Sequence, residues 1–416
     1  MSTVAVIFPG QGSQYIGMGR EAHRAHASVR SRFEQASDIV GYSLEHLCFE
    51  ATPAELTRTA HAQVALFVLS YSMYEVLVQE RHPQVSCMAG HSLGEITALG
   101  TAGALSFEDA VALVKVRGEA MDRCAAMEDS GMIAVLEVPA DEVARLVRRF
   151  NMRGHDVRVA NDNGPTQTVL AGSRASLKEL SPVLEDAGAR VALLNVAGAF
   201  HSPYMAEAVA PFVEATADCA LSTPRVPVIS TVTGRVYRDA DDIRDALAVQ
   251  LTSPVLWRTV VQEIARREPL AWLEVGPKTV LTKMVSRILG DGHLVAGVDG
   301  DPAQLARVFE QIAAAEPGPS LVALCLGAAA ATRNRNFDNA AYTAGVVEPY
   351  QQLVDLNNSV SADIPTDVAD RQAIELLRTI MTTKLVPSAE QEDRIGIILG
   401  RTANHALAAE LGLAVR

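Results

Sequence analysis

The chain has 416 residues, of which 49% are hydrophobic and 20% charged, a composition typical of a soluble globular protein with a large core. Its formal net charge of −13 argues against a nucleic-acid-binding protein, because neutralising phosphates requires clustered Lys and Arg. An acidic protein partner would have to dock on a local basic patch. At this length a single core is uncommon, so we expect two or three structural units.

Cysteine usage and apolar segments bear on the cellular compartment. The five cysteines are scattered and lack C-x-x-C spacing, which suits a reducing compartment without disulfides, structural zinc or another metal site. The N-terminus, MSTVAVIFPGQG, lacks a basic region and soon reaches Pro and Gly, unlike a secretory signal peptide. The longest apolar run, residues 321–331, is well short of the ~20 residues that span a bilayer. We expect a cytoplasmic protein that does not enter a membrane.

The first part of the chain has the pattern of an α/β protein with an insertion. Residues 1–128 alternate strand-like runs, such as VAVIF and VSCMAG, with helical stretches, which favours parallel strands. Residues 129–196 follow the order β-α-β-β-α-β, which is typical of a ferredoxin-like module. Residues 197–298 hold two further strands, VPVISTV and AWLEVG, with a helix between them. We predict a core built from 1–128 and 197–298, with a ferredoxin-like subdomain inserted between the two parts.

The last part, residues 299–416, is rich in Ala and helical in pattern, and we expect a helical C-terminal extension there. The stretch NAAYTAGVVEPYQQLVDL places apolar side chains at helix-face spacing, which usually marks a buried face. The side chains of this stripe are Tyr342, Val346, Val347, Tyr350 and Leu353.

A G-x-S-x-G string, residues 90–94, follows the strand VSCMAG and precedes a helical stretch. In that context the string predicts a nucleophile elbow, in which glycines relieve crowding at a strained turn and the Ser92 hydroxyl is presented to a substrate. The alternative is structural, since Ser92 and Glu95 have the spacing of a helix capping box. The position between a strand and a helix favours the catalytic interpretation.

Five motifs in order resemble a known family. They are FPGQGSQ at 8–14, GHSLGE at 90–95, VRGEAM at 116–121, GAFHS at 198–202 and EVGP at 274–277. These motifs are similar to those of the malonyl-CoA:acyl-carrier-protein transacylases. The resemblance implies an α/β-hydrolase-like core with an inserted ferredoxin-like subdomain, and a Ser-His dyad. It also implies malonyl-CoA and an acyl carrier protein as partners, with no cofactor, because the CoA thioester is a substrate.

His201 follows a strand and the turn Gly198-Ala199-Phe200, where side chains can converge at the edge of a sheet. A lone His in a loop is usually structural, but the resemblance implies that His201 is the base for Ser92. No acidic residue with a clear sequence signal completes a triad. The resemblance implies that the main-chain carbonyl of Gln250 orients the imidazole instead.

The FPGQGSQ turn matches neither G-x-G-x-x-G nor a Walker loop, which disfavours a dinucleotide or phosphate site. The resemblance implies an oxyanion hole formed by the main-chain N–H groups of Gln11 and Leu93. It also implies that Phe200 narrows the acyl pocket and disfavours an α-methyl group on the substrate.

Arg117 interrupts the apolar face of a helix that we expect to begin after Ser106. An inward-pointing charge must find a partner, because burying it alone is strongly unfavourable. One interpretation is a structural ion pair with an internal Asp or Glu. The resemblance implies instead that Arg117 binds the free carboxylate that distinguishes malonyl from acetyl.

Three functions fit these motifs. The first is transfer of a malonyl group from malonyl-CoA through an acyl-Ser92 intermediate to the phosphopantetheine thiol of a carrier protein, for polyketide or fatty-acid synthesis. The second is an acyl hydrolase that clears acyl groups from carrier proteins, and the third is a non-catalytic docking scaffold. Intact Ser92, His201 and Gln11 disfavour the scaffold, and Arg117 favours transfer over hydrolysis.

Residues 330–350 resemble extensions that follow stand-alone acyltransferases serving polyketide synthases in trans. This second resemblance implies that ketosynthase or linker regions of a polyketide synthase are further partners.

Overall fold

The computed structural model describes residues 3–315, 320–359, 366–402 and 404–413. The chain divides into two compact units, Met1–Ala315 and Glu316–Arg416. The division falls after the helix α14 (Pro302–Ala315), and not at the expected residue 299. This helix belongs to the first unit because Val308 and Ile312 are buried in the hydrophobic core of that unit.

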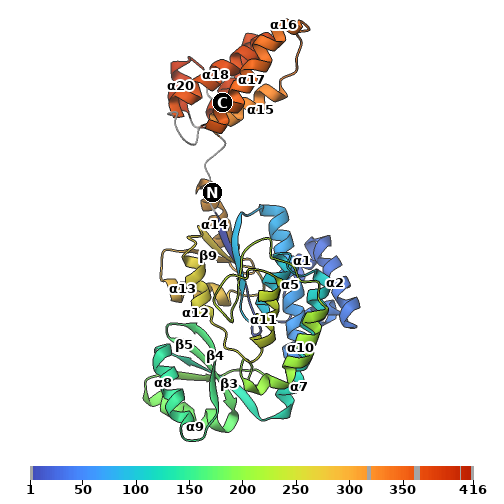
Figure 1. Cartoon of the computed structure of the whole chain (residues 1–416), viewed down its shortest axis with the longest axis vertical. Coiled ribbons are helices and arrows are strands. Elements are labelled where there is room, and N and C mark those ends of the chain that lie inside the picture. The colour runs from blue at the N-terminus through green and yellow to red at the C-terminus, as the bar shows by residue number, and fades with distance from the viewer. Residues whose placement is uncertain (1–2, 316–319, 360–365, 403, 414–416) are drawn as a thin grey trace. The chain divides into compact units, whose positions relative to one another are not determined.

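A five-stranded sheet, parallel throughout, lies at the centre of the first unit (Figure 1). The strand order is β7-β2-β1-β8-β9, with bounds β1 Val4–Phe8, β2 Val85–Gly90, β7 Val228–Ile229, β8 Ala271–Glu274 and β9 Leu294–Gly297. The strands expected at VAVIF, VSCMAG, VPVISTV and AWLEVG are confirmed, although β7 is much shorter than its sequence pattern. The edge strand β9 was not predicted, because four residues between glycine-rich turns give little periodic signal.

The central strand β1 is buried on both faces. Its side chains alternate, so that Phe8 joins one hydrophobic cluster and Ile7 joins another on the opposite face. Helices therefore cover both faces of the sheet. The Phe8 face packs against α5 (Thr59–Arg81), α6 (Leu93–Thr101) and α7 (Phe107–Met127), and the Ile7 face against α12 (Trp257–Ala265) and α13 (Val280–Leu289).

Outside the inserted segment, the other described helices of this unit are α1 Arg20–Ala25, α2 Ala27–Val40, α3 Leu44–Phe49, α4 Pro53–Thr57, α10 Ala206–Asp218 and α11 Ala240–Gln250, with a 3-10 turn at Pro203–Met205. The helix α7 begins where the sequence predicted, since the Ser106 hydroxyl accepts a hydrogen bond from the Asp109 N–H at 3.0 Å.

Among the described helices, α5 is the one long and apolar enough to cross a membrane by length and composition. However, 67% of its apolar stretch is buried inside the protein. It packs against α2, α6 and α7, which is the environment of a core helix.

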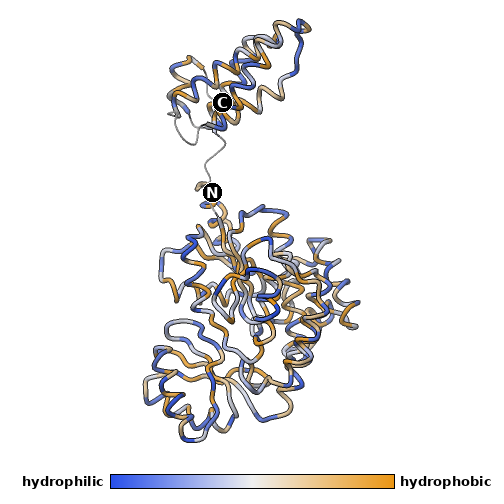
Figure 2. Tube along the Cα trace, in the orientation of Figure 1, coloured by the Kyte–Doolittle hydropathy of each residue, from blue (hydrophilic) through white to orange (hydrophobic). Residues whose placement is uncertain are grey.

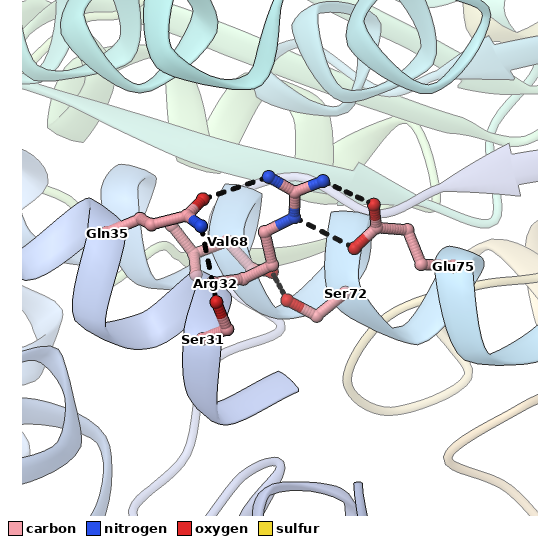
Figure 3. A network of polar contacts seen from close by, with 6 residues as sticks. All are labelled: Ser31, Arg32, Gln35, Val68, Ser72 and Glu75. Carbon is pink, nitrogen blue, oxygen red and sulfur yellow. Dashed lines mark hydrogen bonds and ion pairs between the residues drawn. The ribbon is translucent and has the colours of Figure 1, made fainter. Parts of the chain in front are cut away.

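An ion pair fixes α2 against α5 (Figure 3), and a ring contact of the same arginine joins α2 to the start of α7. Arg32 of α2 donates to the Glu75 carboxylate of α5 through Nε at 3.0 Å and Nη2 at 2.6 Å. Its third nitrogen, Nη1, donates to Gln35 at 2.9 Å, and the guanidinium lies 4.6 Å from the ring centre of Phe107. Hydrogen bonding to Glu75 raises the pKa of Arg32. This contact fixes the two helices, α5 and α7, that supply side chains to the candidate active site.

A second sheet, antiparallel and four-stranded, is formed by the inserted segment (Figure 1). Its strand order is β4-β5-β3-β6, and α8 and α9 pack on one face around a separate hydrophobic cluster. The bounds are β3 Ser130–Leu136, α8 Ala140–Asn151, β4 Val157–Gly164, β5 Gln167–Ser173, α9 Arg174–Asp186 and β6 Arg190–Leu193. The predicted order of elements is confirmed. An ion pair between Asp162 and Arg258, with N···O distances of 3.0 and 2.9 Å, ties β4 to α12 of the core.

The unit Glu316–Arg416 is helical and has a hydrophobic cluster of its own. Hydrophobic and hydrophilic residues alternate along its helices (Figure 2), as expected of helices that pack on one face. Its described elements are α15 Leu321–Ala331, α16 Asn339–Tyr342, a π-helical turn Thr343–Val347, α17 Glu348–Ser359, α18 Thr366–Thr383, α19 Ser388–Arg401 and α20 His405–Glu410.

The apolar stripe predicted at 342–353 is confirmed for four of its five members. Val346 and Leu353 are buried in the cluster, and Tyr342 and Tyr350 pack against it half-buried. Val347 is 50% exposed, so its assignment to the stripe was wrong. The π-helical turn explains the error, because it adds a residue per turn and shifts the face on which Val347 lies.

Truncation tests the boundary between the two units. We expect a chain ending at Ala315 to fold, because each unit has its own hydrophobic cluster. A chain ending at Gly300 loses the buried side chains of Val308 and Ile312, each worth ~1.5–3 kcal/mol of burial, and should melt at a lower temperature. Circular dichroism melting curves of the two chains provide the comparison. Equal melting temperatures would contradict the assignment of α14 to the first unit.

Candidate active site

Ser92 lies in a tight turn between β2 and α6, at the carboxyl end of the parallel strands. Its φ of 54° and ψ of −104° are rare for a residue with a side chain. The turn is closely packed, since a Cβ at Gly90 would lie 1.9 Å from the main chain of Gly94, and a Cβ at Gly94 would lie 2.1 Å from the Phe8 carbonyl oxygen. Only glycine fits at both positions, so the G-x-S-x-G pattern is a packing requirement of this turn.

The Ser92 hydroxyl contacts two polar side chains and does not cap the following helix. Its Oγ lies 2.7 Å from Nε2 of His201 and accepts a hydrogen bond from Nη2 of Arg117 at 3.1 Å. No side-chain cap from Ser92 is present at the start of α6, and the Glu95 carboxylate accepts from Thr231 and other donors instead. The capping-box alternative is therefore wrong.

The His201 ring lies against a main-chain carbonyl. Its Nδ1 donates to the carbonyl oxygen of Gln250 at 3.1 Å, which leaves the lone pair of Nε2 facing the Ser92 hydroxyl. Burial, and then the positive charge of Arg117, lower the pKa of His201 to about 3. The imidazole is thus neutral near pH 7 and able to accept a proton.

Arg117 is buried, with 1% of its surface exposed, and its hydrogen-bond acceptors are neutral. Nη1 donates to Gln63 Oε1 at 2.6 Å and Nε donates to Gln250 Oε1 at 3.1 Å. Burial lowers its pKa to about 10, and the Glu95 carboxylate acts in the opposite direction. No carboxylate of the described residues forms an ion pair with Arg117, so the structural ion-pair interpretation is wrong. The guanidinium stays charged near pH 7 with its charge unpaired.

Two further polar residues belong to this site: Gln63 was given no role from the sequence, and Glu95 was considered only as part of a capping box. Gln63 lies on α5 and is 1% exposed, and Glu95 lies on α6 and is fully buried. Each is a polar side chain within an apolar helical stretch, which is a signal that sequence inspection could have used.

A small cavity of about 90 Å³ adjoins these groups. It is lined by six of the seven predicted site residues, Gln11, Ser92, Leu93, Arg117, Phe200 and His201. The seventh, Gln250, lies behind it and reaches the site through its hydrogen bonds. A larger cavity of about 590 Å³ beside α1 and α14 contains none of the seven.

The residues predicted for the oxyanion hole and the pocket wall come from separate segments of the chain that line this cavity. Leu93 is the first residue of α6, so no carbonyl within the helix can accept its main-chain N–H. Gln11 lies in the turn after β1, where its side chain is 3.5 Å from the Thr59 hydroxyl. Phe200 is 5% exposed and precedes His201 directly.

This arrangement has the parts of an acyl-transfer site. A serine hydroxyl faces a neutral imidazole, the residue that follows the serine begins a helix, and an unpaired cation lies beside the hydroxyl. The cation would attract a substrate that carries a carboxylate near its reacting carbonyl.

Residues 5–308 match the sequence model of the acyl transferase domain. The chain belongs to this family. A malonyl CoA-acyl carrier protein transacylase of Bacillus subtilis strain 168 is 35% identical over 307 residues, which cover 74% of this chain and 96% of that protein. Another transacylase of that name, from Bacillus subtilis, is 30% identical over 400 residues and covers 94% of this chain and 99% of that protein, so the similarity reaches into the C-terminal unit.

Further members of the acyl transferase family link the chain to polyketide enzymes. The polyketide biosynthesis protein ThaF of Burkholderia thailandensis is 37% identical over 321 residues, which cover 77% of this chain but only 27% of that longer protein. Among solved structures, a malonyl-transacylase in complex with its type II polyketide synthase acyl-carrier protein has a TM-score of 0.71 and 32% identity. That match covers 74% of this chain and all of the solved chain (100%).

The ionisation of His201 gives a test of the site that needs no substrate. We expect the imidazole to stay neutral at about pH 5, where a histidine with an ordinary pKa near 6.5 would be mostly protonated. Arg117→Ala removes a nearby positive charge and should raise the pKa of His201. NMR titration of the His201 ring in both proteins measures this. An imidazole that protonates with an ordinary pKa in the unchanged protein would contradict the buried, cation-flanked site.

Proposed function

We propose that this protein transfers a malonyl group from malonyl-CoA to the phosphopantetheine thiol of an acyl carrier protein, through an acyl-enzyme on Ser92. The observation that carries the proposal is the unpaired guanidinium of Arg117, 3.1 Å from the Ser92 hydroxyl. Its fork can bind the free carboxylate of a malonyl group while the thioester carbonyl lies at Ser92.

The reaction proceeds in two half-reactions. Ser92 Oγ attacks the thioester carbonyl while His201 Nε2 takes the hydroxyl proton, and the N–H groups of Gln11 and Leu93 bind the oxyanion. The C–S bond then breaks, and His201 returns the proton to the departing CoA sulfur. In the second half, the carrier thiol gives its proton to His201 and attacks the acyl-Ser92 ester, and the serine leaves with that proton.

Two further residues shape this chemistry. The carbonyl of Gln250 keeps the His201 ring in place, as its 3.1 Å hydrogen bond supports. Phe200 narrows the acyl pocket and disfavours an α-methyl group, which its burial in the cavity wall supports.

The architecture and setting form part of the same proposal. The core, residues 1–128 and 197–315, is α/β-hydrolase-like, and 129–196 is a ferredoxin-like subdomain, as the antiparallel order β4-β5-β3-β6 with two helices on one face supports. Residues after 315 form a helical extension. The names of its relatives, which include polyketide biosynthesis proteins and a transacylase in complex with a type II polyketide synthase carrier protein, support a role in polyketide synthesis, with fatty-acid synthesis as the alternative setting. Ketosynthase or linker regions of a polyketide synthase are proposed as further partners from the resemblance of residues 330–350. Five free, buried cysteines support a cytoplasmic location.

Ser92→Ala tests the nucleophile. We expect no covalent malonyl-enzyme, because no other hydroxyl lies in the elbow, and an unchanged fold, because the side chain makes no cap. His201→Ala should keep Ser92 but slow its acylation ~10²- to 10⁴-fold. Intact-protein mass spectrometry after incubation with malonyl-CoA measures both. A malonyl adduct on the alanine variant at position 92 would refute the assignment.

Arg117→Ala tests the substrate class. We expect malonyl loading to fall roughly 100-fold, as when one partner of a buried charge pair is removed, while acetyl loading is kept or increased. Arg117→Lys is the matched control, because it keeps the positive charge but lacks the planar guanidinium. Its malonyl loading rate should lie between those of the unchanged protein and Arg117→Ala. Loading rates with malonyl-CoA and acetyl-CoA give the comparison. Undiminished malonyl loading would reduce Arg117 to a structural residue and favour the acyl hydrolase.

A further inference from the structure

Glu95 is fully buried three residues after Ser92, and donors surround its carboxylate. Oε1 accepts from the Thr231 N–H at 2.8 Å and from the Tyr237 hydroxyl at 2.6 Å. Oε2 accepts from the Thr231 hydroxyl at 2.6 Å and from Gln250 Nε2 at 2.7 Å. Four donors to one buried carboxylate satisfy both of its oxygens and fix it in position.

The contact with Gln250 determines which way that side-chain amide points. A carboxylate can only accept, so the Gln250 NH₂ must face Glu95 and its carbonyl oxygen must face the opposite way. That oxygen accepts from Arg117 Nε at 3.1 Å. If the amide were reversed, its NH₂ would face the guanidinium, and two donors would oppose each other.

The Glu95 carboxylate also acts on Arg117 electrostatically, without a direct contact. Glu95 favours the charged form of the guanidinium, against the effect of burial. The amide between them keeps the two charges from forming a direct pair, so the Nη2 edge of Arg117 stays directed at Ser92 and the cavity. A direct carboxylate partner would occupy the fork that the proposed substrate needs.

We propose that Glu95 is the positioning residue of the Arg117 anion site. Through Gln250 it holds the guanidinium in the orientation that receives the malonyl carboxylate, and its charge keeps a buried cation stable without pairing to it. Thr231 and Tyr237 hold Glu95 in turn. This inference rests on the proposed function, since it concerns the substrate-binding group of that same site.

Glu95→Gln tests the inference, because it keeps size and burial but introduces an NH₂ that faces the NH₂ of Gln250. One of the two amides must turn. If the Gln250 amide turns, Arg117 Nε loses its acceptor, and in either case Arg117 loses the nearby negative charge of Glu95. In the full-length protein we expect kcat/KM for malonyl-CoA to fall roughly 10- to 100-fold, chiefly through KM. Acetyl loading of Ser92 does not use the anion site and should fall less than malonyl loading, so the ratio of malonyl to acetyl loading should decrease.

Glu274→Gln is the matched control. Glu274 is also a fully buried carboxylate, with its own donors from the Leu281 N–H at 3.0 Å and from Thr282, but it caps α13 away from Ser92. We expect it to lower the melting temperature without changing the ratio of malonyl to acetyl loading. Tyr237→Phe is the alternative test if Glu95→Gln does not fold. It removes one donor from Glu95 and should raise KM for malonyl-CoA, by a smaller factor than Glu95→Gln.

The outcomes separate the two proposals. If Arg117→Ala abolishes malonyl selectivity but neither Glu95→Gln nor Tyr237→Phe alters it, the positioning role of Glu95 is wrong and the proposed function stands. If Glu95→Gln lowers malonyl and acetyl loading equally, as expected from a loss of folded protein, Glu95 is only structural. If Arg117→Ala leaves malonyl loading intact, the proposed function itself fails.

Discussion

A buried, unpaired guanidinium is the constraint around which this site is organised. Removing a cation from water opposes folding, and Arg117 is almost completely buried. The protein compensates with neutral amide oxygens from Gln63 and Gln250 and with a carboxylate held one residue further away. A direct ion pair would have satisfied the charge more simply, but it would have left no positive charge available to a ligand. The stability of the core and the capacity of the site to bind an anion therefore depend on the same contacts.

The surroundings of His201 likewise orient its ring while limiting its basicity. A carbonyl orients the His201 ring but stabilises its protonated form less than a carboxylate would. The nearby cation also disfavours protonation, so the imidazole is a weak base in the empty enzyme. A bound malonyl carboxylate would offset the charge of Arg117 and make proton transfer from Ser92 easier. In the proposed mechanism, binding of the malonyl carboxylate and activation of Ser92 are coupled through this one electrostatic interaction.

The fold brings these groups together from distant parts of the chain. The elbow lies at the end of β2, His201 follows β6 of the second sheet, and Gln250 ends α11. The second sheet joins the core through the Asp162–Arg258 ion pair, and α2, α5 and α7 are fixed by Arg32 and its partners. Both attachments lie outside the cavity, so they can hold its walls without occupying it.

Features that depend on neighbouring residues could be predicted from the amino-acid sequence. The strand patterns of VAVIF and VSCMAG, the Ser106 cap and the glycines around Ser92 are local, because strand alternation, capping and steric crowding act over a few residues. Ordered motifs identified the family and, through it, the residues that line the cavity. Local periodicity failed at Val347, where a π-helical turn changes the register, and at α14, whose apolar face could not indicate which unit it joins.

The partners of Arg117 could not be predicted in this way, because they come from distant parts of the chain. Its partners Gln63 and Gln250 lie 54 and 133 residues away in the chain, and Glu95 meets Gln250 across 155 residues. The sequence showed that the inward-pointing charge of Arg117 needs a partner, but the residues near it in the chain do not show whether that partner is a carboxylate or an amide. Which of them reaches the guanidinium depends on how α5, α6, α7 and α11 pack against one another, and that packing is a property of the whole fold.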